Sequence, residues 1–333
     1  LAEKRADIET SPEGKMLITY RIRPEARWDN GTPVTARDVE FTLKVIKNPK
    51  VNCQHVKSYY DFISDFRFYP NDPNKFTLIC NTVYIQAEAT SGDYNGILPE
   101  YFYDPKGLMR KFSVSQLSQE TEKLAGDPKI VEFANDFNSE KRMREKEFIS
   151  GCGAYKLAEW KTGEQIVLEK KDNWWGDQLK DVNHYFQANP KKIIYRTIND
   201  QTTALVSLKA GNIDVMRSIK SKDFAELPKS NKFNENFNAY TPMMLSYTYI
   251  GMNNKKPQFN DKLTRQAMSH LLDVDKMIQT IKYGQAKRVI GPVHPSKTKD
   301  YNVDLIPYDY NPSKTKELLE QAGWKNTNGD ETI

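Results

Sequence analysis

Short stretches of the chain alternate between apolar and polar residues, which is the period of a strand that buries one face. Residues 15–22 place Ile18 and the apolar residues two positions on either side of it on one face. Residues 66–69 and 75–80 flank a turn rich in proline and asparagine, so they predict a hairpin. We therefore expect a sheet early in the chain.

The clearest hairpin signal spans residues 155–171. The apolar residues of both arms recur at every second position, and residues 161–164 supply turn chemistry with one glycine. Gly151 and Gly153 precede the first arm and let the chain bend sharply as it enters. We therefore expect one structural unit to pass to the next at this point.

Other stretches repeat apolar residues at every third or fourth position behind a capping residue, which predicts amphipathic helices. Thr35 is well placed to cap the first of them. Gly211 and Gly323 stand at the C-terminal ends of two others, where glycine commonly closes a helix. The helices predicted in this way cover residues 36–46, 114–124, 128–137, 200–210, 261–278 and 312–322.

The alternation also predicts strands over residues 213–216 and 240–254. With the preceding strand and helix, the first of these would complete a β-α-β unit. Arg217, Ser218 and Ile219 would then lie at the carboxyl end of a strand, where open α/β sheets bind ligands. A guanidinium at this point can hold a carboxylate with two hydrogen bonds, although a solvated arginine at a strand end is an equally good interpretation.

The composition places the chain among globular proteins. Its 333 residues suffice for two domains, and 38% of them are hydrophobic, with a mean hydropathy of −0.73. No run of about twenty apolar residues predicts a membrane span. The charged start, Leu1 to Arg5, is not a signal peptide, so we expect any export signal to have been removed or to lie outside this chain.

Charge argues against nucleic acid as a partner. The net charge is +5, but the 49 basic and 44 acidic residues are interspersed almost everywhere. Neighbouring charges of opposite sign screen one another, so no basic stripe follows from the sequence. We expect no nucleic-acid binding.

Candidate chemistry is sparse. Cys53, Cys80 and Cys152 are far apart and odd in number, which favours three buried or half-buried thiols with at most one disulfide. His55 beside Cys53 is weak evidence for a metal site. The motifs of serine hydrolases, zinc proteases and phosphate-binding loops are absent, and Cys152 has no histidine close in sequence. We expect no enzyme, no catalytic residue, no metal and no cofactor.

The hairpin segment resembles a hallmark of the family 5 extracellular solute-binding proteins, which include the dipeptide- and oligopeptide-binding receptors of ABC importers. It reads Gly-x-Gly-x-Tyr-Lys-Leu, then Ile-Val-Leu-Glu, then Asn-Trp-Trp-Gly, between residues 151 and 176. Further segments resemble the family in the same order: Trp-Asp-Asn-Gly-Thr-Pro-Val-Thr-Ala-Arg-Asp-Val at 28–39, the hairpin of 66–80, the helix ending Ala-Gly-Asn-Ile-Asp at 214, the Asn-Asn to Arg-Gln-Ala segment of 253–267, and the Asn-Pro to Ala-Gly-Trp helix of 311–324.

The resemblance implies an α/β fold of the type II periplasmic-binding-protein-like class, with two lobes of mixed β-sheets flanked by helices. It assigns residues 1–147 to a subdomain of lobe 1, residues 148–245 to the core of lobe 1, and residues 246–333 to the start of lobe 2. A helical insertion over about 86–147 carries no family motif, and we interpret it as a decorated surface. Relatives extend past both ends, so we expect a fragment with an incomplete second lobe that lacks much of the peptide clamp.

The function that the resemblance implies is the substrate-binding component of an ABC transporter. Such a protein is a monomer that captures di- or oligopeptides between its lobes and docks on an ABC permease in the inner membrane. It is periplasmic, or is anchored to the cell envelope as a lipoprotein. The same fold also binds nickel chelates and oligosaccharides, and it can serve as a peptide- or protein-interaction receptor without transport, so these alternatives stay open.

The resemblance also implies residues of a ligand cleft. Tyr59 and Tyr60 follow a helix and reach toward the ligand in relatives, although tyrosines beside an apolar pair more often border a core. Tyr247, Tyr249 and Gly251 are the candidates in the later segment. An acidic residue that the oligopeptide-binding branch carries near Gly251 is absent. Together with Arg217, Ser218 and Ile219, these are the predicted ligand-binding residues.

Overall fold

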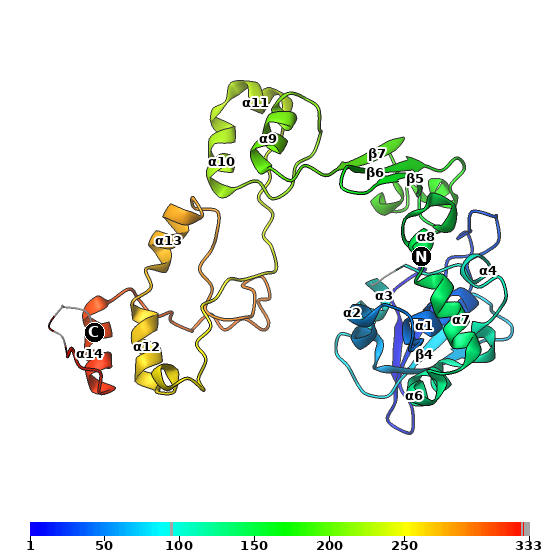
Figure 1. The fold of residues 1–333 in the computed structure, drawn as a ribbon, viewed down its shortest axis with the longest axis horizontal. Helices are drawn as coiled ribbons and strands as arrows, with labels where there is room; N and C mark the ends of the chain where they lie inside the picture. The colour runs from blue at the N-terminus through cyan, green and yellow to red at the C-terminus, as the bar shows by residue number, and fades with distance from the viewer. Residues whose placement is uncertain (94–95, 328, 330–333) are drawn as a thin grey trace. The chain divides into compact units, whose positions relative to one another are not determined.

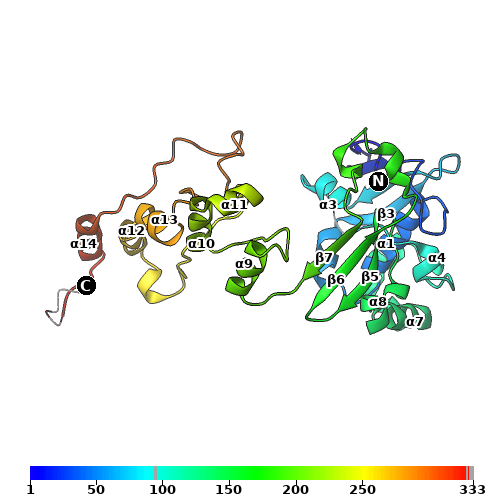
Figure 2. The same cartoon turned by 90° about the horizontal axis from the view of Figure 1, so that it is seen from above.

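The computed structural model describes residues 1–93, 96–327 and 329. Its contacts divide the chain into two compact units, Leu1–Thr197, here called unit 1, and Ile198–Ile333, here called unit 2. Unit 1 carries the blue to green elements in Figure 1 and Figure 2, and unit 2 carries the elements from α9 onward. The predicted division at residues 147 and 245 stays a prediction.

Unit 1 contains a four-stranded antiparallel sheet in the order β1-β2-β4-β3. Ile18 of β2 lies opposite Leu78 of β4, and both side chains are buried. This confirms the alternation predicted for β2 and the hairpin of β3 and β4. The strands are β1 (Asp7–Thr10), β2 (Met16–Arg21), β3 (Ile63–Phe68) and β4 (Lys75–Cys80).

Helix α1 (Ala36–Lys47) lies between two cores of unit 1. Thr35 caps it as predicted, and Asp38 completes a capping box by accepting a hydrogen bond from the Thr35 backbone N–H. One face of α1 buries Leu43 in a core shared with the four-stranded sheet. Another face buries Phe41 in a second core. The helix therefore needs apolar cover on both sides.

The second core comes largely from residues 86–147, so their interpretation as a decorated surface was wrong. Met109, Leu117 and Ile130 are fully buried there, against Phe41 of α1. The predicted helix over 114–124 also breaks at Glu120. The helices before the second sheet are α2 (Gln54–Lys57), α3 (Ala87–Asp93), α4 (Glu100–Tyr103), α5 (Val114–Gln119), α6 (Thr121–Leu124), α7 (Pro128–Phe137) and α8 (Glu140–Arg144), with 3₁₀ turns η1 (Ser58–Tyr60), η2 (Met109–Lys111) and η3 (Lys146–Phe148).

The predicted hairpin of residues 155–171 is confirmed. It forms β5 (Tyr155–Lys161) and β6 (Gln165–Lys170), and Gly163 takes φ of 80° in the turn between them. β7 (Lys192–Arg196) adds to β6, so the sheet is antiparallel in the order β5-β6-β7. Val167 is the one residue of these three strands that is buried, and it keeps 7% of its surface exposed. The 3₁₀ turns η4 (Trp175–Leu179) and η5 (His184–Phe186) lie between β6 and β7.

Unit 2 is built from short helices. The predicted single helix over residues 261–278 was wrong, because it ends at His270 and Asp273 caps a second helix that begins at Val274. The side chains of Asp200, Asp261, Asp273 and Asn311 each accept a backbone hydrogen bond at the start of a helix. Its helices are α9 (Gln201–Lys209), α10 (Ser221–Glu226), α11 (Asn231–Asn236), α12 (Lys262–His270), α13 (Val274–Ile281) and α14 (Pro312–Gln321), with 3₁₀ turns η6 (Leu227–Lys229) and η7 (Pro257–Phe259). None of the helices in the described ranges has the length and apolar character of a membrane span.

The predicted strand over residues 213–216 is not formed. Ile213, Met216 and Ile219 instead pack at intervals of three residues against a small cluster centred on Leu208. The strand prediction was wrong because the buried residues are three positions apart, whereas a strand with one buried face would bury every second residue. The predicted β-α-β unit is likewise absent from the described residues.

The predicted strand over residues 240–254 is also not formed. This segment is irregular, and side chains meant for a buried face, such as Met244, are exposed. A strand is stable only when a neighbouring strand satisfies its backbone groups, and no strand in the described part of unit 2 is available to do so.

Candidate functional site

The predicted tyrosines of unit 1 occupy different environments in η1. Tyr60 is only 4% exposed and belongs to the first core, and its backbone carbonyl accepts a hydrogen bond from Lys47 Nζ at 3.2 Å. Tyr59 is 49% exposed. Of the pair, Tyr59 is therefore the side chain that a ligand can reach, and Tyr60 anchors the turn that presents it.

Arg217, Ser218 and Ile219 form a tight turn in unit 2. Ser218 has φ of 59°, and its carbonyl accepts a hydrogen bond from Gln201 Nε2 at 2.7 Å. Gln201 Oε1 in turn accepts from the Lys220 backbone N–H at 2.9 Å, while Ile219 packs on the small cluster of unit 2. One glutamine side chain thus clamps this turn on both sides, next to an exposed Arg217.

Tyr247, Tyr249 and Gly251 lie together in the irregular segment of unit 2. The two rings are 5.6 Å apart between centroids and tilted by 36°. A Cβ at Gly251 would lie 3.3 Å from the Tyr249 ring, so a larger residue would crowd that ring. The structure therefore brings these three predicted residues together as one exposed aromatic surface.

Tyr59 and Tyr60 belong to unit 1, and the remaining candidates belong to unit 2. The role of both groups of residues in ligand binding stays a prediction.

A junction that sequence reasoning missed fixes the entry to the second sheet. Lys171 Nζ pairs with Asp29 Oδ1 at 2.5 Å and donates to the Gly151 carbonyl at 2.5 Å. The indole N–H groups of Trp174 and Trp175 both donate to the carbonyl of Cys152, at 2.9 and 2.8 Å. The glycine-flanked entry is therefore held by side chains, and the Asn-Trp-Trp-Gly segment of residues 173–176 supplies two of the donors.

A cavity of about 880 Å³ lies beside this junction, within unit 1. One wall is the loop between β2 and α1, and the other is formed by the start of β5 and the segment after β6. It is lined by Pro24, Glu25, Arg27, Trp28, Asp29, Gly31, Cys152, Lys156, Lys171, Asp172, Asn173, Trp174, Trp175 and Gln178. We call it the junction cavity.

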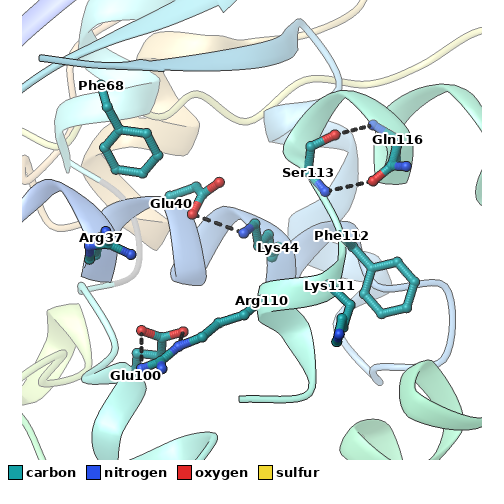
Figure 3. Close-up of a pocket in the computed structure, with 10 residues that line it drawn as sticks. All are labelled: Arg37, Glu40, Lys44, Phe68, Glu100, Arg110, Lys111, Phe112, Ser113 and Gln116. Carbon is teal, nitrogen blue, oxygen red and sulfur yellow. Dashed lines mark hydrogen bonds and ion pairs between the residues drawn. The ribbon is translucent and has the colours of Figure 1, made fainter. Parts of the chain in front are cut away.

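A smaller cavity of about 430 Å³ lies over the outer side of α1. Figure 3 shows the ion pair of Lys44 with Glu40 along the helix and Arg110 in a two-pronged contact with Glu100. Both carboxylates are thus already neutralised by residues of the same cavity. Arg37 and Lys111 line the cavity as well and pair with neither carboxylate, so its lining carries more basic than acidic side chains.

The three cysteines are free and are buried or half-buried as expected. Burial raises the pKa of Cys80 to about 11. Burial also raises the pKa values of Cys53 and Cys152. Because the thiolate is the reactive form, these environments work against a nucleophilic cysteine.

Burial also raises the pKa of Asp38, mainly by desolvation, and hydrogen bonds from Thr35 and the Glu100 backbone lower it again in part. Trp28 Nε1 lies toward this carboxylate without a hydrogen bond of standard geometry. The signature segment around these residues is therefore structural. No group of three His, Cys, Asp or Glu side chains suited to a metal occurs among residues 1–93, 96–327 and 329.

Solved structures with the same architecture define the class of the fold. NikA from Brucella suis, solved in complex with Fe(III)-EDTA, superposes with a TM-score of 0.66 at 19% identity over 98% of this chain and 56% of that one. AppA from Bacillus subtilis, solved with a nonapeptide, gives 0.63 at 25% identity over 98% and 56%. The fold is thus that of the type II periplasmic-binding-protein-like solute-binding proteins.

The family model of the bacterial extracellular solute-binding proteins, family 5 (middle), matches residues 1–333, and the chain belongs to this family. The resemblance drawn from the hairpin and the other motifs is confirmed.

The curated relatives include both peptide and nickel binders. The oligopeptide-binding protein AppA of Bacillus subtilis (strain 168) is 26% identical over 321 residues, which is 96% of this chain and 50% of that protein. The nickel-binding periplasmic protein of Escherichia coli (strain K12) is 26% identical over 176 residues, 52% of this chain and 31% of that protein. The chain spans about half the length of this oligopeptide-binding relative.

Proposed function

We propose that this protein is the substrate-binding component of an ABC transporter and captures di- or oligopeptides in a cleft between two lobes. The observation that carries the proposal is the similarity to the oligopeptide-binding AppA along 96% of the chain. The fold supports it as well, since AppA with a bound nonapeptide has the same architecture. Peptide binding by this fold uses main-chain hydrogen bonds and roomy side-chain pockets.

Arg217 is proposed to bind a carboxylate of the peptide. Its guanidinium makes no hydrogen bond or ion pair with any residue that the structure describes, and the Gln201 clamp fixes the turn that presents it. Because the backbone of this turn is already fixed, binding costs no further ordering of that backbone when the guanidinium forms a two-pronged contact. Ser218 and Ile219 shape this turn.

Tyr247 and Tyr249 are proposed to form an aromatic surface for peptide side chains, with Gly251 leaving room for the Tyr249 ring. Tyrosine suits this role because its ring is rigid and its hydroxyl can still accept or donate a hydrogen bond. Tyr59 is the proposed contact from unit 1, and Tyr60 supports it from the core.

The remaining features of the proposal follow from the family. Its members are extracellular solute-binding proteins. We propose that this protein is a monomer without enzymatic activity that delivers its ligand to a membrane permease, and that it is periplasmic or held at the cell envelope as a lipoprotein.

A nickel chelate is the second candidate ligand. It is favoured by the similarity to the nickel-binding protein of Escherichia coli and to NikA with Fe(III)-EDTA. Similarity to these relatives does not decide between a peptide and a nickel chelate as the ligand of this protein. A binding measurement separates the two candidates.

Isothermal titration calorimetry of the protein with a pool of tri- to nonapeptides, with a nickel–histidine chelate and with an oligosaccharide separates the candidates. The proposal predicts heat with peptides alone. Arg217→Gln should weaken peptide binding about tenfold, since a charged hydrogen bond is worth roughly 1.5–3 kcal/mol. Arg196→Gln, an exposed arginine of β7, is the matched control. Heat with the chelate and none with peptides would overturn the peptide assignment.

A further inference from the structure

The cavity over α1, here called the α1 cavity, has a lining with more positive than negative charge. Its basic and acidic lining residues are Arg37, Lys44, Arg110 and Lys111 on one side of the balance, and Glu40 and Glu100 on the other. Opposite charges are interspersed along most of the chain, so this excess is a local feature. A local excess of positive charge attracts anions.

Both acidic residues of the α1 cavity are already paired. Lys44 Nζ lies 2.9 Å from Glu40 Oε2, and Arg110 contacts the two carboxylate oxygens of Glu100 at 2.8 and 3.1 Å. The side chains of Glu40 and Glu100 are 19% and 13% exposed. Neither acid is therefore available to cancel the remaining positive charges of the cavity.

Those remaining charges belong to Arg37 of α1 and Lys111 of η2. Both residues are exposed, and their side chains form no hydrogen bond or ion pair with any residue that the structure describes. Figure 3 shows them on opposite sides of the contact between Arg110 and Glu100. A guanidinium holds a carboxylate with two parallel hydrogen bonds, and an ammonium attracts one as a point charge. A ligand with two carboxylates can therefore satisfy both cations at once.

A capping box fixes a neutral donor in the same lining. The Gln116 backbone N–H donates to Ser113 Oγ at 3.0 Å, and the Ser113 backbone N–H donates to Gln116 Oε1 at 2.9 Å. The side-chain amide of Gln116 is thus held through its oxygen, while its Nε2 group donates to no residue in the described ranges. This group is a preorganised donor for a carboxylate oxygen.

The size of the α1 cavity suits a small organic ligand. Its volume of about 430 Å³ falls in the lower part of the range of roughly 300–1,000 Å³ that ligand pockets occupy. Phe68, which is 41% exposed, adds apolar surface to the lining. A short carbon chain with a carboxylate at each end matches this combination of cations and apolar surface.

We propose that the α1 cavity binds a small organic dicarboxylate, with Arg37 and Lys111 as the counter-charges of its two ends and Gln116 as a neutral donor. All three residues belong to unit 1, and none of them is among the proposed peptide contacts. The site is thus separate from the proposed peptide cleft, and a failure of peptide binding would leave it unaffected.

Saturation-transfer difference NMR at constant ionic strength tests the proposal with glutarate, because it detects a weakly bound ligand through the ligand's own signals. Glutarate should give a saturable signal at millimolar concentration. Glutaramide, which has the same carbon chain without charge, should give none. Butyrate, which lacks one of the two carboxylates, should bind about fivefold more weakly. Equal binding of glutaramide or butyrate, or no signal with glutarate, would overturn the proposal.

Variants of the two cations test which residues form the site. Arg37→Gln and Lys111→Gln should each raise the dissociation constant of glutarate about fivefold, and the double variant should abolish the signal. Arg144→Gln removes an exposed arginine of α8 that does not line the cavity, so it is the matched control and should change nothing. Unchanged binding in the double variant, or an equal loss in Arg144→Gln, would overturn the proposal.

Discussion

Unit 1 and unit 2 differ in how much of their apolar surface they bury. Unit 1 has two cores around α1, with residues such as Ile18 and Met109 fully buried. The described residues of unit 2 form a small cluster around Leu208, Leu227 and Phe233, and many large side chains of this unit are exposed. The same kinds of sequence pattern thus produce packed structure only where the described chain supplies both sides of a contact.

The largest expected effect is the loss of a core side chain in unit 1. Phe41→Ala removes a ring that is 2% exposed and packs edge-on against Phe133. We expect a loss of roughly 3–5 kcal/mol in the free energy of unfolding, because a large cavity is left behind. The counterpart in unit 2, Met244→Ala, removes an exposed side chain and should change stability by less than about 0.5 kcal/mol. Chemical denaturation monitored by circular dichroism measures the stability loss of each variant. Similar losses in Phe41→Ala and Met244→Ala would contradict the difference in burial between the two units.

The second effect is a fall in stability at high pH that is confined to unit 1. Cys80 is fully buried, and its pKa is raised from its ordinary value of 9.0 to about 11. The folded state therefore holds the thiol proton more tightly than the unfolded state. The stabilisation is complete below pH 9 and is lost as the pH rises toward 11, by roughly 2–3 kcal/mol.

Denaturant midpoints measured at pH 8, 9, 10 and 11 test this effect, with Cys80→Ala as the comparison. The variant should be less stable at pH 8 but should lose less stability above pH 9 than the parent. Parallel pH profiles for the two proteins would show that another group causes the loss.

A smaller effect is expected from the junction of unit 1. Lys171 is 12% exposed and is bound to Asp29 and to the Gly151 carbonyl. Lys171→Met removes both contacts, and we expect a loss of about 1–2 kcal/mol after allowance for the partly exposed Asp29. Alkylation of Cys152 should become faster because the adjacent segment opens more often.

Lys192→Met is the matched control for this junction. Lys192 pairs with Glu169 in the same sheet, but both side chains are largely exposed, so the change should cost less than about 0.5 kcal/mol. Mass spectrometry after timed alkylation reports Cys152 separately from Cys53 and Cys80. An unchanged Cys152 rate in Lys171→Met would mean that the contacts do not hold the junction.

The smallest effect concerns helix caps. Thr35→Ala removes the cap of α1 in unit 1, and Asp273→Ala removes the cap of α13 in unit 2. Each loss is about 1 kcal/mol locally. We expect the first to lower the global stability of unit 1 and the second only to speed amide exchange within α13, which buries none of its residues. Amide hydrogen exchange distinguishes a global loss of stability in unit 1 from local opening of α13. A uniform increase in exchange across unit 2 in Asp273→Ala would contradict this expectation.

Local signals predicted the structure well wherever the interaction is close in sequence. Thr35, Asp200, Asp261 and Asn311 cap helices as predicted, since a cap needs only a side chain and the first turn. The 155–171 hairpin also formed, because its turn fixes the register of both arms.

Predictions failed where the outcome depends on distant partners. The segment 240–254 has the alternation of a strand but no strand to pair with in the described residues of unit 2. The second core was missed because the burial of Met109 against α1 joins segments about sixty residues apart, which no local period reveals.

Among the candidate functional residues, too, those that only the fold brings together could not be predicted from the sequence. Tyr247 and Tyr249 were found from the family resemblance and lie together in the structure. The junction of Lys171 with Asp29 carried no sequence signal, because neither residue is unusual until the fold joins them.

The central claim is that the exposed surface of unit 2 serves to bind peptides. Hydrogen exchange with mass spectrometry, with and without a saturating pool of tri- to nonapeptides, tests it most directly. We predict slower exchange around Arg217 and across residues 240–251, together with the turn that carries Tyr59, and unchanged exchange in the cores of unit 1. Unchanged exchange in all three segments, with peptide in excess, would contradict the claim.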